Sequence, residues 1–313
     1  MNLFSGKTTI DFMGKRHIGM TFSAILMAVA VYSLLTRGLV LGIDFTGGTV
    51  IEVGYQQPVA AAEVRQILDQ AGFSEAVVQS YGGPRELLIR LAPRQEESSA
   101  QLSNRVLEAL SQGGTAQVEM RRVEYVGPQV GDELIRDGIL AVIYALIGIL
   151  IYVAVRFEKR FSLGAVLALF HDVVITLGVF SLFGIEFDLT VLAAILAIIG
   201  YSINDTIVVY DRVREGFRRL RRETPQQVVN ISINETLSRT INTSLTVLLV
   251  VVALFLFGGE VIHGFALAMI IGVGFGTYSS VYVASALTLM LGVSREDLLP
   301  PHKEGADKGE AKR

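Results

Sequence analysis

The stretch LTVLAAILAIIGYSINDTIVVY, residues 189–210, decides the fold of this chain. It carries one charged residue, Asp205. An α-helix of this length reaches about 33 Å, whereas the hydrocarbon core of a bilayer is about 30 Å thick. The stretch therefore predicts a transmembrane helix with one buried acid. Comparable apolar runs occur at residues 18–36, 138–155, 162–183, 238–257 and 262–291. We expect a polytopic α-helical membrane protein with six spans.

The composition agrees with this and excludes several other classes of protein. Charged residues make up 18% of the chain, against about 25% in soluble domains. The net charge of −3 does not indicate nucleic-acid binding. Cysteine is absent and the four histidines are scattered, so the sequence predicts no disulfide, no thiolate chemistry, no metal site and no organic cofactor.

Lysine and arginine predict the orientation, because they are enriched in cytoplasmic loops. Basic residues occur in the tail 1–17, after the second span, and in the loop 211–237, which has six arginines up to Arg222. The short loops 184–188 and 258–261 have none. Both termini, including the tail 292–313, are therefore expected in the cytoplasm. A signal peptide is the alternative for the first run, but that run is long and no clear cleavage site follows it.

Residues 37–137, between the first two spans, are expected outside the cytoplasm. Strands are predicted at 49–55, 75–81, 86–91 and 115–126, and helices at 58–70 and 96–111. The order β-α-β-β-α-β is that of the ferredoxin-like α+β fold. This fold hosts many functions, so it identifies none.

A glycine-rich segment, GIDFTGGT at residues 42–49, leads into this domain. It is one residue away from a phosphate-binding loop, but Gly48 stands where that loop requires lysine. Without the lysine the β- and γ-phosphates lose their cation, so nucleotide binding is disfavoured. We interpret the segment as a turn that joins the first span to the first strand.

Polar side chains inside the spans are the candidate functional residues, because a charge at the centre of a span costs roughly 2.5–3.5 kcal/mol. Asp205 is the strongest candidate, and the polar residues beside it are Ser202, Asn204 and Thr206. His171 and Asp172 lie at a similar depth in the neighbouring span. Arg239 begins the fifth span at its cytoplasmic end.

A buried carboxyl can couple proton movement to helix movement. In a low dielectric an unpaired carboxylate takes up a proton, whereas one paired with arginine stays ionised. An elementary charge moving down 100 mV releases about 2.3 kcal/mol. Simpler interpretations remain open: Asp205 as a static hydrogen-bonded acid, Arg239 as an arginine that extends to the surface, and His171 with Asp172 as a polar packing contact.

Small residues recur every four positions in the sixth span, at Gly272, Gly276, Ser280 and Ala284. Small side chains at this spacing let helix backbones approach closely. The pattern predicts tight packing, either inside the chain or against a partner.

Three stretches, with a fourth continuing them, resemble the SecF family of the bacterial Sec protein-export machinery, within the RND transporter superfamily. They are Leu41-Gly-Ile-Asp-Phe-Thr-Gly-Gly-Thr49, Phe170-His-Asp-Val-Val174, Gly200-Tyr-Ser-Ile-Asn-Asp-Thr-Ile-Val-Val-Tyr-Asp-Arg-Val-Arg-Glu215 and Glu235-Thr-Leu-Ser-Arg-Thr240. The resemblance covers essentially the whole chain, including the six spans of an RND-like half and the large first loop.

The resemblance implies a function, partners and site residues. It implies a bacterial inner-membrane subunit that pairs with SecD and uses the proton motive force, with protons as the only coupling ion. Exported preproteins would pass through the SecYEG channel after SecA has started the transfer, possibly with YajC present. The family's proton-relay carboxyl falls on Asp205 and its linked arginine on Arg239. The family motif in the outer segment falls on Gly42, Asp44, Gly47 and Gly48.

Three other functions stay open at this point. The chain could be half of an RND pump for lipids or drugs, although its outer domain is small for that class. Ser202 and His171 could form an intramembrane catalytic dyad, but no oxyanion hole is identifiable and Asp205 is then unexplained. A pure scaffold is the third alternative, and it predicts that no intramembrane carboxyl matters.

Overall fold

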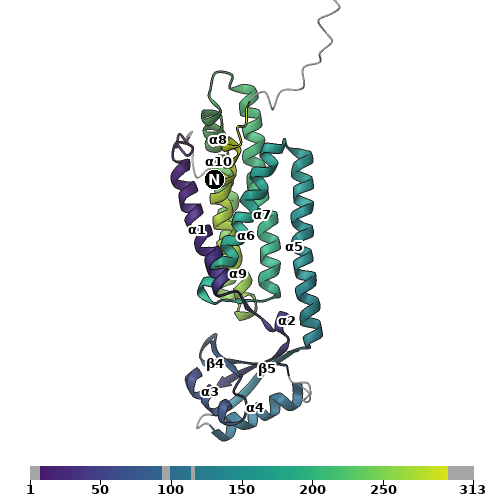
Figure 1. The fold of residues 1–313 in the computed structure, drawn as a ribbon. Helices are drawn as coiled ribbons and strands as arrows, with labels where there is room; N and C mark the ends of the chain where they lie inside the picture. Colours follow the sequence, from purple (N-terminus) through teal and green to yellow (C-terminus); the bar gives the residue numbers. More distant parts are fainter. Residues whose placement is uncertain (1–7, 94–98, 114–116, 295–313) are drawn as a thin grey trace, which may run out of the picture.

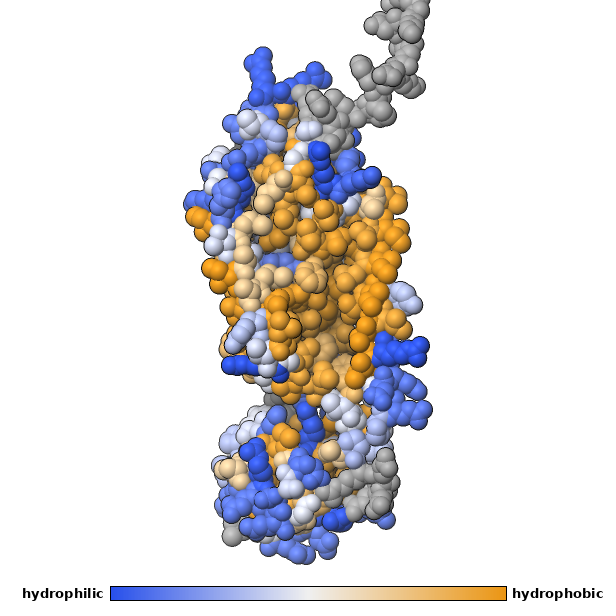
Figure 2. All heavy atoms as spheres, viewed as in Figure 1, coloured by the Kyte–Doolittle hydropathy of each residue, from blue (hydrophilic) through white to orange (hydrophobic). Residues whose placement is uncertain are grey.

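A bundle of long helices carries a small α+β domain at one end (Figure 1). This computed structural model describes residues 8–93, 99–113 and 117–294. A broad apolar belt surrounds the bundle, and hydrophilic surface covers both ends (Figure 2). Six helices in the described part are long and apolar enough to cross a membrane, as predicted. Residues 1–7 and 295–313, which belong to the two predicted tails, lie outside the described ranges.

The small domain separates the first two spanning helices, and short connections join the others. The six spanning helices are α1 (Arg16–Thr36), α5 (Pro128–Arg156), α6 (Lys159–Phe183), α7 (Leu189–Arg219), α8 (Pro225–Phe257) and a last helix in three segments. Those segments are α9 (His263–Ser279), the π-helical turn η2 (Ser280–Ala284) and α10 (Ser285–Met290). A short 3₁₀ turn, η1 (Glu260–Ile262), precedes them.

Three helices run beyond the spans predicted from hydropathy. Residues 128–137, assigned to the outer domain, form the first turns of α5, and most of the loop 211–237 is helical in α7 and α8. Hydropathy marks only the part of a helix in lipid, whereas helical hydrogen bonds continue into water when the ends are capped. The start of α8 has such a cap, in which Thr224 and Gln227 exchange side-chain-to-backbone hydrogen bonds ahead of Pro225.

Helices α6, α7 and α9 form the centre of the bundle. Glycines let α9 approach α7 closely: a Cβ atom on Gly272 would lie 2.3 Å from Ile198, and one on Gly276 would lie 3.2 Å from Ser202. The four-residue spacing of small side chains thus serves packing inside this chain. Helix α1 packs on α6 in the same way, since a Cβ atom on Gly178 would lie 2.2 Å from that of Ala30.

Helices α1, α5 and α8 form the perimeter and present exposed apolar side chains. Examples are Ile18, Leu35, Ile139, Ile151, Val155, Leu249, Leu256 and Phe257. Apolar surface on this scale is typical of a surface that contacts lipid or another membrane helix rather than water.

The small domain is an antiparallel four-stranded sheet with two helices. Its elements are β2 (Gly48–Tyr55), α3 (Ala61–Gln70), β3 (Val77–Tyr81), β4 (Gly83–Leu91), α4 (Ser99–Gly113) and β5 (Val118–Val126). The strands lie in the order β3-β4-β2-β5. Apolar side chains from the sheet, α3 and α4 form one core, in which Val53, Leu68 and Val106 are fully buried. The first residues of the helix predicted at 96–111 and of the strand predicted at 115–126 lie outside the described ranges.

The glycine-rich segment is more structured than the turn that we predicted. Strand β1 (Val40–Leu41) pairs in parallel with β6 (Glu186–Phe187), which lies between α6 and α7, and α2 (Ile43–Thr46) follows. These short elements pack between the bundle and the sheet (Figure 1). They were missed because two-residue strands form only where distant segments meet, and local propensity does not encode that meeting.

Candidate functional site

Asp205 lies on α7 inside the bundle, and its residue is 2% exposed. The hydroxyl of Ser244, on α8, donates a long hydrogen bond of 3.4 Å to its Oδ2 atom. Ser244 also shares a 2.6 Å hydrogen bond with Thr277 of α9 and accepts one of 3.1 Å from the Tyr201 hydroxyl. Hydroxyl groups from α7, α8 and α9 therefore surround a carboxyl that has no close ionic partner among the described residues.

Arg239 lies on α8, five residues before Ser244, and is exposed. Its charge acts on the Asp205 carboxyl through space, but the described ion pairs do not include one between these two residues. A cation that influences an acid without pairing with it can respond to a change in the acid's charge. This arrangement is compatible with a carboxyl that gains and loses a proton.

A second buried carboxyl, Asp172, lies on α6 and is completely inaccessible. Its Oδ2 atom accepts hydrogen bonds from the hydroxyls of Ser202 on α7, at 2.5 Å, and Ser279 on α9, at 2.7 Å. Its Oδ1 atom lies 2.9 Å from Nδ1 of His171. This cluster thus connects α6 to both α7 and α9.

The residues predicted to support Asp205 do not all lie beside it. Ser202 donates to Asp172 instead, Asn204 is exposed, and Thr206 is buried in the same helix. The sequence shows which residues share a turn, but only the packing shows which neighbouring helix each side chain meets. The catalytic dyad is also not formed, because Ser202 hydrogen-bonds to Asp172 and not to His171.

Three hydroxyl groups at these sites were not assigned from the sequence: Ser244, which donates to Asp205, Thr277, which is hydrogen-bonded to Ser244, and Ser279, which donates to Asp172. The available signal was weak, since isolated hydroxyls in apolar helices commonly bond their own backbone. Thr277 and Ser279 also make such bonds, to the carbonyls of Val273 and Gly276.

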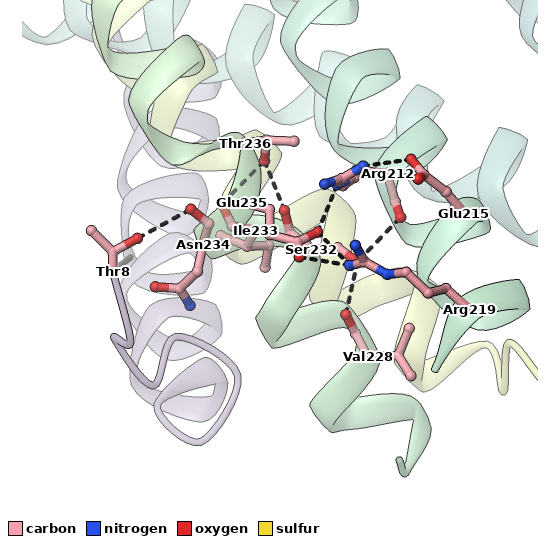
Figure 3. Close-up of polar contacts among 10 residues, drawn as sticks. All are labelled: Thr8, Arg212, Glu215, Arg219, Val228, Ser232, Ile233, Asn234, Glu235 and Thr236. Carbon is pink, nitrogen blue, oxygen red and sulfur yellow. Dashed lines mark hydrogen bonds and ion pairs between the residues drawn. The ribbon is translucent and has the colours of Figure 1, made fainter. Parts of the chain in front are cut away.

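An ion-pair network holds α7 against α8 at the end of the bundle opposite the small domain (Figure 3). The carboxylate of Glu235 accepts from Arg212 at 2.6 Å and from Arg219 at 2.6 and 2.8 Å. Glu235 lies one turn before Arg239 on α8. These exposed pairs are individually weak, and together they link α8 to α7 one turn before Arg239.

The segment that precedes α1 is attached beside this network. Side-chain amides of Asn230 and Asn234, one turn apart on α8, bind backbone groups of residues 10–13. The Thr8 hydroxyl also donates to the backbone carbonyl of Asn234 at 3.1 Å (Figure 3). The beginning of the described chain thus contacts the helix that carries Arg239.

At the other end of α7, the glycine-rich segment is joined to the helix that carries Asp205. The Asp44 carboxylate accepts from the backbone N–H of Leu189, the first residue of α7, at 3.0 Å. Asp188 caps the same end by accepting from Val191 at 2.8 Å. The backbone N–H of Gly42 donates to the Phe187 carbonyl at 2.9 Å. Asp44 therefore belongs to a contact between the small domain and α7, not to a phosphate site.

Asp44→Ala is expected to loosen the first turn of α7, because it leaves one helix N–H without an acceptor and removes a negative charge from the helix N-terminus. Losses of this kind cost about 1 kcal/mol. Hydrogen exchange of peptides that cover residues 186–192, measured in the membrane-embedded protein, should become several-fold faster. Asp44→Asn is the matched control because it keeps an acceptor oxygen, and equal exchange in Asp44→Ala and the unchanged protein would contradict the assignment.

The side chains that contact the two buried acids are mainly hydroxyl groups. Within the described ranges, no group of three or more histidine, aspartate and glutamate residues is placed to ligate a metal. The hydroxyls that contact Asp172 and Asp205 can donate to an ionised carboxylate and accept from a protonated one. These contacts are therefore compatible with either protonation state of each acid.

Comparison with known proteins finds relatives along almost the whole chain. The pattern described as protein export membrane protein SecD/SecF, C-terminal, matches residues 106–294, and the SecD/SecF GG motif matches residues 32–59. The chain is 50% identical to the protein translocase subunit SecF of Vibrio alginolyticus, over 97% of this chain and 98% of that protein. It is 45% identical to the SecF subunit of Escherichia coli O157:H7, over 97% and 95% of the two chains.

Two solved structures are also similar. A crystal structure of SecDF, a translocon-associated membrane protein from Thermus thermophilus, matches with a TM-score of 0.84 and 39% identity over 92% of this chain. A crystal structure of SecDF in a super-membrane-facing form matches with a TM-score of 0.69 and 40% identity. In both comparisons this chain spans only 39% of the SecDF chain.

Proposed function

The chain belongs to the SecD/SecF family of protein export membrane proteins, and from this premise we propose that it is the SecF subunit of a SecDF complex. In this proposal the complex uses the proton motive force to promote the late stage of protein export through SecYEG. The partners are SecD, SecYEG with or without YajC, and the exported preproteins. Protons are the coupling ion and no other cofactor takes part.

The observation that carries the proposal is the environment of Asp205. This acid is buried in a span, accepts a long hydrogen bond from Ser244, and lies close enough to Arg239 for the two charges to interact. Proton uptake neutralises Asp205 and removes its attraction for Arg239. Helix α8 is then free to shift against α7, and proton release restores the first arrangement.

The shift reaches the small domain through the contact between Asp44 and the first turn of α7. We assign this domain to the ferredoxin-like fold, which the strand order β3-β4-β2-β5 and the placement of α3 and α4 support. The domain lies on the outer side of the bacterial inner membrane, with both termini in the cytoplasm. The basic residues at the opposite end of the bundle support this orientation. We assign no enzymatic reaction to the chain.

Proteoliposomes test the proposal. SecYEG, SecA, SecD and this chain are reconstituted, and completion of export is measured after SecA action is stopped, with and without an imposed proton gradient. We expect the gradient to accelerate completion severalfold only when both SecD and this chain are present. Equal rates with and without the chain would contradict the proposal.

Half of an RND-type pump for lipids or small molecules remains the alternative function. Co-purification from a mildly solubilised membrane distinguishes the two functions. An export subunit must co-purify with SecD and SecYEG, whereas half of a pump must not. The close similarity to SecF subunits favours export.

A further inference from the structure

Asp172 is a second buried acid, and the proposed role of Asp205 does not use it. Together with its partners His171, Ser202 and Ser279 it forms the Asp172 cluster. All three of its close partners can donate: the hydroxyls of Ser202 and Ser279 to Oδ2, and the Nδ1–H of a neutral His171 to Oδ1. A carboxylate that receives three donors in a dry site is stabilised in its ionised form. The arrangement in the structure is thus a complete shell for ionised Asp172.

The same heavy-atom positions also suit the protonated acid. Ser279 Oγ lies 2.7 Å from Asp172 Oδ2 and 3.1 Å from the carbonyl oxygen of Gly276. When Asp172 is ionised, the Ser279 hydroxyl donates to the carboxylate. When Asp172 carries a proton, its O–H donates to Ser279 Oγ, and the serine hydroxyl turns to the Gly276 carbonyl. The site therefore exchanges one hydrogen-bond pattern for another by rotating a single hydroxyl.

His171, the histidine of this cluster, has one ring nitrogen without a hydrogen-bond partner among the described residues. It is 4% exposed, and its Nε2 atom is buried without a hydrogen-bond partner. In the tautomer whose Nδ1–H donates to Asp172, Nε2 is an acceptor, and a buried polar atom without a partner is costly. Two ionisable groups lie near this cluster: Tyr278 of α9, whose ring centroid lies 6.4 Å from that of His171, and Asp205, one turn beyond Ser202 on α7.

The cluster is placed to affect the packing of the bundle. It joins α6 to α7 and α9, and α9 changes to a π-helical turn immediately after Ser279. Such turns occur frequently at functional sites in helices. Gly276 makes the close approach possible, because a Cβ atom there would lie 3.2 Å from Ser202 Oγ and 3.6 Å from Asp172 Oδ2.

We propose that Asp172, assisted by His171, is a second proton-binding site in this chain, separate from Asp205. One proton adds to the Asp172 carboxylate and the same proton leaves, so that no bond between heavy atoms changes. The ionised acid holds α6 to α7 and α9 through charge-assisted hydrogen bonds, and the protonated acid holds them less tightly. The inference rests on the proposed proton-driven function and adds a second titrating group to it.

Infrared difference spectroscopy of the purified complex with SecD tests this directly. The C=O stretch of protonated carboxyl groups is followed as the pH is changed, in Asp205→Asn and in the double variant Asp205→Asn/Asp172→Asn. We expect the single variant to keep a titrating buried carboxyl that the double variant lacks. Ser279→Ala should change the carboxyl band, because one hydrogen-bond partner of Asp172 is lost. Identical spectra for the single and double variants would overturn the proposal.

Export measurements then separate this inference from the proposed function. Asp172→Asn is expected to reduce proton-stimulated export at least tenfold, since asparagine preserves the shape of the site but cannot ionise. If Asp172→Asn assembles poorly, Asp172→Glu, which restores a titrating group, should recover stimulation. Full stimulation in Asp172→Asn would mean that the cluster is only a packing contact. Normal export in Asp205→Asn would instead contradict the proposed function, while the infrared result for Asp172 would still stand.

Discussion

Asp205→Asn is expected to abolish the stimulation of export by a proton gradient while leaving the chain folded and bound to SecD. Asparagine has nearly the same shape as aspartate, and its amide oxygen still accepts the hydrogen bond from Ser244. It cannot ionise, so the interaction with Arg239 no longer changes during a cycle. The rate of export completion with a gradient should fall to the rate without one.

Two variants at neighbouring positions control this experiment. Asn204→Ala alters an exposed residue next to Asp205 in the same helix and should leave stimulation unchanged. Asp205→Glu restores an ionisable carboxyl and should recover part of the stimulation. Normal stimulation in Asp205→Asn, at normal abundance and with normal SecD binding, would exclude Asp205 as the coupling group and favour a scaffold role.

Gly48→Ala is expected to destabilise the small domain more than any other alanine substitution in the glycine-rich segment. The residue has a φ angle of +126°, which side-chain-bearing residues rarely adopt. A Cβ atom there would also lie 2.4 Å from the carbonyl oxygen of Leu91, which is backbone and cannot move aside freely. Strain of this kind costs about 3 kcal/mol.

The consequence extends to the whole sheet, because Gly48 begins the central strand β2. It faces Val126 of β5, and the next residue, Thr49, faces Leu91 of β4. Limited proteolysis of the membrane-embedded chain should therefore cleave the small domain markedly faster in Gly48→Ala.

Gly38→Ala is the matched control for Gly48→Ala. Gly38 also has a positive φ angle, +70°, but a Cβ atom there would meet nothing within 4 Å. Gly38→Ala therefore measures the cost of a positive φ angle alone, without the cost of an overlap such as the one between residue 48 and Leu91. Equal proteolysis of the two variants would show that the close approach of Gly48 to β4 does not contribute.

The sequence by itself determined the features that depend on local composition. Six apolar runs of sufficient length predicted six spanning helices, since each run must bury its own backbone hydrogen bonds in lipid. The alternation of strands and helices predicted every main element of the small domain. Asp205 stands out as a candidate because a lone acid in an apolar run is conspicuous on its own.

The tertiary structure alone decided which side chains meet. It placed Ser202 and Ser279 on Asp172, Thr277 on Ser244, and Asp44 at the first turn of α7. All of these contacts join residues far apart in the chain. Each depends on the rotation and separation of neighbouring helices. Contacts between many side chains set these quantities, including the close approach that Gly276 permits. Hydropathy and helical periodicity describe each helix separately, so they contain no information about how one helix faces the next.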